Sequence, residues 1–197
     1  MHRCKPRSEA ILAALLALVV FTVGCQGSDP DAGPAPPPAT GEGASPLGQR
    51  YTNDEAGFVL DYPEGWTAQE VADQPAVLVA LFQRQSAGDG FAENVNVLLE
   101  ELPAGVTLDE YTSANRANLE RAFTNFQVLE EGQQSIGEAP AFWIRYDADQ
   151  EGQRLSFLQA WLVDGERGFV LSFTGQGEDF DAFRPDAEAI ISSFRLT

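Results

Sequence analysis

An apolar run near the start of the chain limits how much of it can fold. Residues 10–24 read AILAALLALVVFTVG and carry no charge, and Arg3, Lys5 and Arg7 precede them. This run of 15 residues is shorter than a membrane span, which needs about 20, and a positive stretch before a short apolar run is typical of a signal peptide. We therefore predict that residues 1–24 are an export signal outside the folded domain.

The apolar run ends at a cysteine, in the sequence Thr22-Val23-Gly24-Cys25. This ending resembles the lipobox of bacterial lipoproteins, although Thr22 stands where that motif usually has Leu. The resemblance implies cleavage before Cys25 and acylation of its thiol, and two acyl chains give stable membrane anchoring. An uncleaved N-terminal anchor and an ordinary secretory signal are the alternatives, and both leave the following chain outside the cytoplasm.

The segment after Cys25 has almost no apolar side chains. Residues 26–49 read QGSDPDAGPAPPPATGEGASPLGQ, which cannot bury enough surface to offset the entropy lost on ordering. We predict a disordered tether over 25–49 that carries a domain at 50–197. Gln26 stands in place of the Asp that retains some lipoproteins in an inner membrane. The expected location is the outer membrane in a Gram-negative cell, and otherwise the outer face of the plasma membrane.

The composition excludes most catalytic sites and nucleic-acid binding. His2 is the only histidine, and the only cysteines are Cys4 and Cys25, so catalytic triads, Cys-His pairs and tetrahedral zinc sites lack their usual groups. The formal net charge is −18, which repels nucleic acid. We expect no enzyme activity and no cofactor, with a carboxylate-based hydrolase as a distant alternative.

The domain at 50–197 alternates strand patterns with turns. Val95, Val97 and Leu99 alternate with Asn94, Asn96 and Glu100 in a pattern that predicts a half-buried strand. The predicted strands cover residues 58–62, 76–83, 95–99, 126–136, 141–146, 155–163 and 169–174. Short turns between most of the later strands favour antiparallel neighbours.

Two helical patterns interrupt the strands. Thr107 and Glu110 have the spacing of a capping box, and the apolar positions of the helix behind it continue to Phe126. A second helix is predicted over 180–194, with Pro185 in its first turn. The predicted fold is therefore of the α+β class, with an antiparallel sheet of six to seven strands covered by helices.

Several short motifs, taken in order, resemble the Mog1/PsbP/DcrB-like superfamily. They are residues 57–66 (GFVLDYPEGW), 94–97 (NVNV), 105–111 (GVTLDEY), 137–141 (GEAPA) and 191–194 (ISSF). The resemblance implies an α/β/α sandwich around an antiparallel sheet. It implies no catalytic residues, because the superfamily has no shared active-site motif.

One acidic segment has part of the spacing of a metal site. Asp147, Asp149 and Glu151 imitate the first half of a calcium-binding EF-hand loop, but Leu158 stands where the bidentate Glu belongs. The segment also lies between two predicted strands, where a hairpin turn explains the same residues. Both interpretations stay open.

Tryptophans and paired glutamates are the other candidate positions. Trp66, Trp143 and Trp161 line a ligand groove or pack in the core, and the pairs Glu100-Glu101 and Glu130-Glu131 form a solvated rim or a partner surface. We predict a non-catalytic, monomeric, membrane-tethered envelope lipoprotein that binds another envelope protein. An envelope protein that binds a small ligand or calcium is the alternative.

Overall fold

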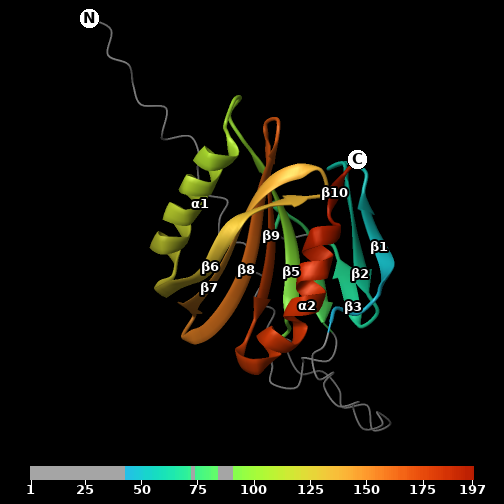
Figure 1. Cartoon of the computed structure of the whole chain (residues 1–197), viewed down its shortest axis with the longest axis vertical. Coiled ribbons are helices and arrows are strands. Elements are labelled where there is room, and N and C mark those ends of the chain that lie inside the picture. The colour runs from blue at the N-terminus through green and yellow to red at the C-terminus, as the bar shows by residue number, and fades with distance from the viewer. Residues whose placement is uncertain (1–42, 72–73, 84–90) are drawn as a thin grey trace, which may run out of the picture.

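The computed structural model describes residues 43–71, 74–83 and 91–197, which form two antiparallel sheets and two helices (Figure 1). The first strand begins at Leu47, three residues before the predicted start of the domain. The apolar run, Cys25 and the tether up to residue 42 lie outside the described residues. The elements are β1 (Leu47–Asn53), β2 (Phe58–Pro63), β3 (Trp66–Gln69), β4 (Val77–Gln83), β5 (Asn94–Glu101), α1 (Leu108–Ala122), β6 (Thr124–Ile136), β7 (Ala139–Gln150), β8 (Gln153–Asp164), β9 (Arg167–Gly175), α2 (Gly177–Ser193) and β10 (Arg195–Leu196).

The larger sheet has seven strands in the order β3-β4-β5-β9-β8-β7-β6, and all neighbours are antiparallel. Its two faces carry separate cores, as β8 shows: Phe157 and Trp161 pack with residues of α1, whereas Leu158 and Leu162 pack with residues of α2. In Figure 1 the two helices stand on either side of strands β6 to β9. This arrangement confirms the predicted antiparallel sheet covered by helices. No helix in the described part of the chain is long and apolar enough to cross a membrane.

A second sheet, in the order β1-β2-β10, contains the strand that we predicted for the main sheet at residues 58–62. That prediction was wrong in its placement, and the short strand β3, which follows the turn at Gly65, takes the edge position of the larger sheet. Phe58 and Leu60 are fully buried in the same core as α2. The Phe58 ring stacks on Phe194 at 5.1 Å between centroids, so the small sheet packs beside α2 on one face of the large sheet.

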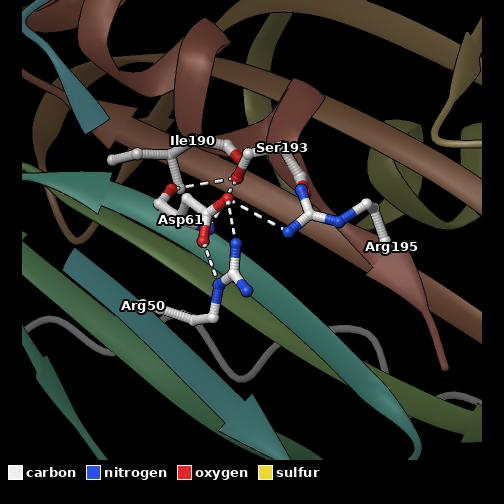
Figure 2. A network of polar contacts seen from close by, with 5 residues as sticks. All are labelled: Arg50, Asp61, Ile190, Ser193 and Arg195. Carbon is white, nitrogen blue, oxygen red and sulfur yellow. Dashed lines mark hydrogen bonds and ion pairs between the residues drawn. The ribbon is translucent and has the colours of Figure 1, made fainter. Parts of the chain in front are cut away.

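The Asp61 carboxylate of the small sheet bonds to Arg50 and Arg195, which lie near the two ends of the domain (Figure 2). Asp61 on β2 accepts hydrogen bonds from Arg50 Nε at 2.6 Å and from Arg195 Nη2 at 3.0 Å. These arginines, Arg50 first, hold the pKa of the Asp61 carboxyl below its usual value. The backbone N–H of Asp61 donates to Ser193 Oγ at 2.8 Å, and its carbonyl oxygen lies 2.9 Å from the same hydroxyl. Ser193 therefore substitutes for a strand partner just before the start of β10.

The start of α1 confirms the predicted capping box. The Thr107 hydroxyl accepts a hydrogen bond from the Glu110 N–H, and the Glu110 carboxylate accepts one from the Thr107 N–H at 3.0 Å. The predicted extension to Phe126 was wrong, because the helix ends at Ala122 and Phe123 already has extended backbone. Phe126 belongs to β6.

The second helix begins earlier than predicted, at Gly177. Pro185 consequently lies inside the helix and not in its first turn. A proline has no N–H for the carbonyl four residues before it, here that of Asp181. The side chain of Asp181 is exposed, so this part of the helix lies at the surface.

Candidate functional site

A groove of about 290 Å³ opens between α2 and the β6–β7–β8 part of the large sheet, and we term it the α2 groove. Its floor is apolar, because Leu158, Ala160 and Ile191 are all buried. Its rim is polar, with Glu130 on one side and Glu188 on the other. The lining residues are Glu130, Gln134, Trp143, Leu158, Ala160, Arg184, Glu188, Ile191 and Ser192.

Trp143 reaches the groove because its cross-strand neighbour has no side chain. Trp143 on β7 pairs with Gly132 on β6, and a Cβ atom on Gly132 would lie 3.0 Å from the indole Nε1. The indole therefore lies over the backbone of β6 and stays partly exposed. The other two tryptophans, Trp66 and Trp161, are fully buried in the two cores. Of the three candidates, Trp143 alone lines this groove.

Two arginine side chains, Arg145 and Arg184, form ion pairs with carboxylates at or beside the groove. Arg145 Nη1 donates to Glu130 Oε1 at 2.9 Å, and its Nη2 lies 3.7 Å from Asp181 Oδ1. Its guanidinium also sits 5.5 Å from the centroid of the Phe180 ring, where a cation–π contact adds attraction. Arg184 Nε lies 3.9 Å from Glu188 and makes no hydrogen bond within the described residues.

The groove has the chemistry of a binding site. A carboxylate hydrolase needs two facing acids, and Glu130 and Glu188 do line the groove from different elements. Each side chain is 54% exposed, however, whereas a catalytic acid is kept protonated by burial. The lining contains neither His nor Cys. Its apolar floor and charged rim are instead the usual composition of a recognition surface.

A second cavity, of about 520 Å³, lies further along β6 at the β6–β7 turn, which Gly137 makes with a φ of 57°. A Cβ atom on Gly137 would lie 3.1 Å from the Phe194 carbonyl oxygen, so the turn packs closely on the chain that leaves α2. Ile136 and Leu196 supply apolar surface to this cavity. Both cavities thus border the second half of β6.

The predicted calcium residues surround an arginine. Arg154 Nη1 lies 3.1 Å from Asp149 Oδ1, and its Nη2 lies 3.8 Å from Asp147 Oδ2. Asp147 also accepts a hydrogen bond from Ser156 at 2.7 Å. Glu151 occupies the turn, with a φ of 50°. No group of three metal-ligating side chains occurs in the described ranges.

The two glutamate pairs have different surroundings. Glu130 and Glu131 bind arginines on opposite faces of β6, Glu130 with Arg145 and Glu131 with Arg116 of α1. Glu100 is not on a solvated rim, because it is largely buried against α1, whereas Glu101 is exposed. Only Glu130 therefore contributes to the α2 groove.

Sequence reasoning missed the polar residues that α2 contributes to the groove, namely Arg184, Glu188 and Ser192. The spacing of Arg184 and Glu188 is that of an i,i+4 ion pair on a helix. That signal could have placed both on one exposed face. Nothing local shows that this face lies opposite Trp143.

This chain matches one protein family and is similar to several solved structures. The sequence profile of the DcrB family matches residues 58–193, which run from β2 to the end of α2. Comparison with curated proteins gives no match.

Three solved structures share the fold at low sequence identity. LpqN of Mycobacterium tuberculosis, described as involved in cell envelope biogenesis, has a TM-score of 0.60 at 15% identity, covering 76% of this chain and 91% of its own. The cyanobacterial PsbP of Synechocystis sp. PCC 6803 has a TM-score of 0.56 at 16% identity, covering 86% of this chain and 100% of its own. The Ran-binding protein Mog1p of Saccharomyces cerevisiae has a TM-score of 0.53 at 12% identity, covering 75% of this chain and 94% of its own.

Proposed function

Because this chain belongs to the DcrB family, we propose that it is a non-catalytic binding module of the cell envelope, tethered to a membrane through Cys25. Its α2 groove would receive an extended segment of a partner protein. Two structural relatives agree with this proposal, since LpqN is described as involved in cell envelope biogenesis and Mog1p as a Ran-binding protein.

The observation that carries the proposal is the position of the groove beside an edge strand. β6 is the last strand of the large sheet, and within the described residues it pairs with β7 alone. Its first half has two register shifts, but residues 130–136 pair regularly with β7. Residues 132–136 (GQQSI) carry no charge and are mostly exposed. An edge of this kind accepts an added strand.

A partner segment that paired with β6 as an added strand would direct alternate side chains toward the two cavities. Glu130, Gly132, Gln134 and Ile136 alternate along β6 and pair with residues of β7 on the α2 side of the sheet. An apolar residue of the partner would then lie over Trp143, and backbone hydrogen bonds to β6 would supply affinity.

Charge indicates a basic partner segment. The groove lining carries two carboxylates, those of Glu130 and Glu188, and one arginine, Arg184. The ion pairs of Arg145 with Glu130 and Asp181 lie beside it. The chain as a whole carries −18. Electrostatic complementarity favours a segment in which Lys or Arg flanks the apolar anchor.

Site-specific photo-crosslinking in cells tests the proposal. A benzophenone amino acid replaces Gln134 at the groove in the full chain, and a matched chain carries it at Glu120 on exposed α1. We expect a partner identified by mass spectrometry from position 134 and not from position 120. The purified partner should then bind Trp143→Ala at least about tenfold more weakly than wild type, as for an interface anchor.

The matched control is Leu129→Ala, which removes the exposed apolar residue of β6 outside the groove. This change should leave the affinity within about twofold. Equal crosslinking at both positions, or equal affinity of the Trp143 variant, would rule out the groove as the binding site.

A further inference from the structure

The regular edge of β6 is seven residues long, from Glu130 to Ile136. Before it, the pairing of β6 with β7 shifts register twice, around Asn125 and at Leu129. Such bulges bend a strand and disrupt its ladder, and Arg154 Nη1 already donates to the carbonyl oxygen of Asn125 at 2.8 Å. After it, the chain turns at Gly137. The edge therefore fits a partner segment of seven residues.

The position opposite Gly132 favours a large aromatic side chain. The space beside Gly132 is taken by the indole of Trp143, since a Cβ atom there would lie 3.0 Å from Nε1 and 3.4 Å from Cε2. A partner side chain opposite Gly132 would therefore meet the indole and not a side chain of β6. The α2 groove, at about 290 Å³, is small for a ligand site, which usually has ~300–1,000 Å³, and suits one side chain. An aromatic ring gains most there, because it also stacks on the indole.

The position opposite Ile136 favours an uncharged apolar side chain. It lies beside the second cavity, where Ile136 and Leu196 supply apolar surface. The charged residues of that lining, Glu138 and Arg195, have opposite signs. Arg195 is also already bonded, through its Nη2, to Asp61 at 3.0 Å. This cavity therefore offers no excess charge to a partner.

The two remaining positions on the α2 side favour polar partners. Glu130 and Asp181 share a single guanidinium, that of Arg145, so one negative charge is in excess there. A basic residue opposite Glu130 would balance that charge, and cross-strand pairs of opposite charge are stabilising. Gln134 is exposed and uncharged. Its amide can both donate to and accept from a polar side chain opposite it.

We propose that the partner segment carries, at alternate positions from its N-terminus, an apolar, a polar, an aromatic and a basic residue. This order follows from a segment antiparallel to β6, as all neighbours in the large sheet are, and antiparallel pairing is the more stable kind. Alternate residues of a strand share a face, so the apolar and aromatic residues are four positions apart. A spacing of three would put them on opposite faces of the sheet. This inference rests on the proposed function and specifies the partner of that site.

Two capped peptides of identical composition test the spacing by calorimetric titration of the full chain. The peptide LTQTFTK has the proposed order, whereas LTQFTTK moves the Phe by one position and so turns it to the α1 side. We expect LTQTFTK to bind at least about tenfold more tightly than LTQFTTK, as for an interface anchor. Gly132→Ala, which puts a Cβ atom against the indole, should weaken binding of LTQTFTK by about tenfold. Ser135→Ala, at an exposed neighbouring position of β6, should stay within about twofold.

A second measurement uses wild-type protein and does not depend on how the variants fold. In ¹⁵N-labelled full chain, LTQTFTK should shift the indole N–H signal of Trp143 and leave those of the buried Trp66 and Trp161 in place. Equal affinity of the two peptides, or binding of neither, would overturn the proposed spacing. The proposed function has a separate readout, since it fails only if crosslinking from position 134 captures no partner.

Discussion

The hydroxyl of Tyr111 on α1 donates a 2.8 Å hydrogen bond to Glu100 Oε2 on β5. This contact joins the helix to the face of the large sheet. Burial raises the pKa of the Glu100 carboxyl, and the Tyr111 hydrogen bond opposes that rise. Burial and the neighbouring Glu100 together raise the pKa of Tyr111. The largely buried carboxylate of Glu100 is thus paired with the phenol of Tyr111.

Glu100→Gln should raise stability at neutral pH. A carboxyl whose pKa is higher in the folded state than in the unfolded state stabilises the fold below its unfolded pKa, and that contribution is lost as pH rises through the folded pKa. The amide oxygen of Gln can still accept the Tyr111 hydrogen bond without a buried charge. We expect a higher Tm than wild type at pH 7, with a difference that shrinks toward pH 4. Glu101→Gln removes the same charge from an exposed position and should change Tm much less.

Gly168→Ala should destabilise the attachment of α1. A Cβ atom at Gly168 would lie 2.6 Å from Tyr111 Cζ and 2.8 Å from its hydroxyl. The fully buried Tyr111 has to shift, and overpacking of this kind lowers the free energy of unfolding by about 1–3 kcal/mol. Urea unfolding measures the change. Gly48→Ala, where nothing lies within 4 Å, is the control, and equal losses in both variants would contradict the steric explanation.

Ser193→Ala should weaken the small sheet. The change leaves the N–H and carbonyl of Asp61 without the hydroxyl that contacts both. Loss of these contacts should lower the free energy of unfolding by about 1–2 kcal/mol. Hydrogen exchange at the Asp61 amide should speed up accordingly. Ser192→Ala alters the exposed neighbour and should leave that exchange rate as it is in wild type.

Cys25→Ser should abolish lipid attachment. If Cys25 carries the acyl chains, cells grown with an alkyne analogue of palmitate will label the wild-type chain, and the variant will lose nearly all of that label. Detergent partitioning should also move the variant to the aqueous phase. Cys4→Ser is the matched control and should keep full labelling, since Cys4 precedes the expected cleavage site. Labelling that follows Cys4 instead would refute the lipobox interpretation.

The calcium prediction can be checked by direct titration. Arg154 already contacts both Asp147 and Asp149, so millimolar calcium should leave the Tm of the wild-type protein unchanged. Arg154→Ala frees both carboxylates and should make the Tm respond to calcium more than wild type does. A clear rise in the wild-type Tm would instead restore the EF-hand-like interpretation.

Local sequence signals correctly predicted the elements that are stabilised by contacts between residues close together in the chain. The start of α1 was predictable because Thr107 and Glu110 satisfy each other's N–H groups within one turn. The hairpins of the later strands followed from short turns. The end of α1 was not predictable, because the apolar spacing continues through Phe126 although the chain turns into β6 at Thr124.

Tertiary relationships lay beyond the sequence pattern. An alternating strand such as β5 looks the same whether its polar face meets solvent or a second core, so Asn94 and Asn96 could not be placed. Strand β1 was missed because its side chains are mostly exposed and show no apolar alternation. The groove depends on two relationships of Trp143. Its position opposite Gly132 is set by strand register, and its position beside α2 brings together segments that are distant in the chain.

The small sheet also determines how the domain responds to a mechanical pull. Traction on the N-terminal segment first meets Ser45, whose N–H donates to Asp186 Oδ1 of α2 at 2.6 Å, and then enters β1 at Leu47. Strand β1 pairs with β2 alone within the described residues. The first ion pair it meets is Arg50 with Asp61, which is itself joined to Arg195 and Ser193. Tension would therefore peel β1 away before it reached the seven-stranded sheet. The domain can yield at this edge while the seven strands of the large sheet stay paired.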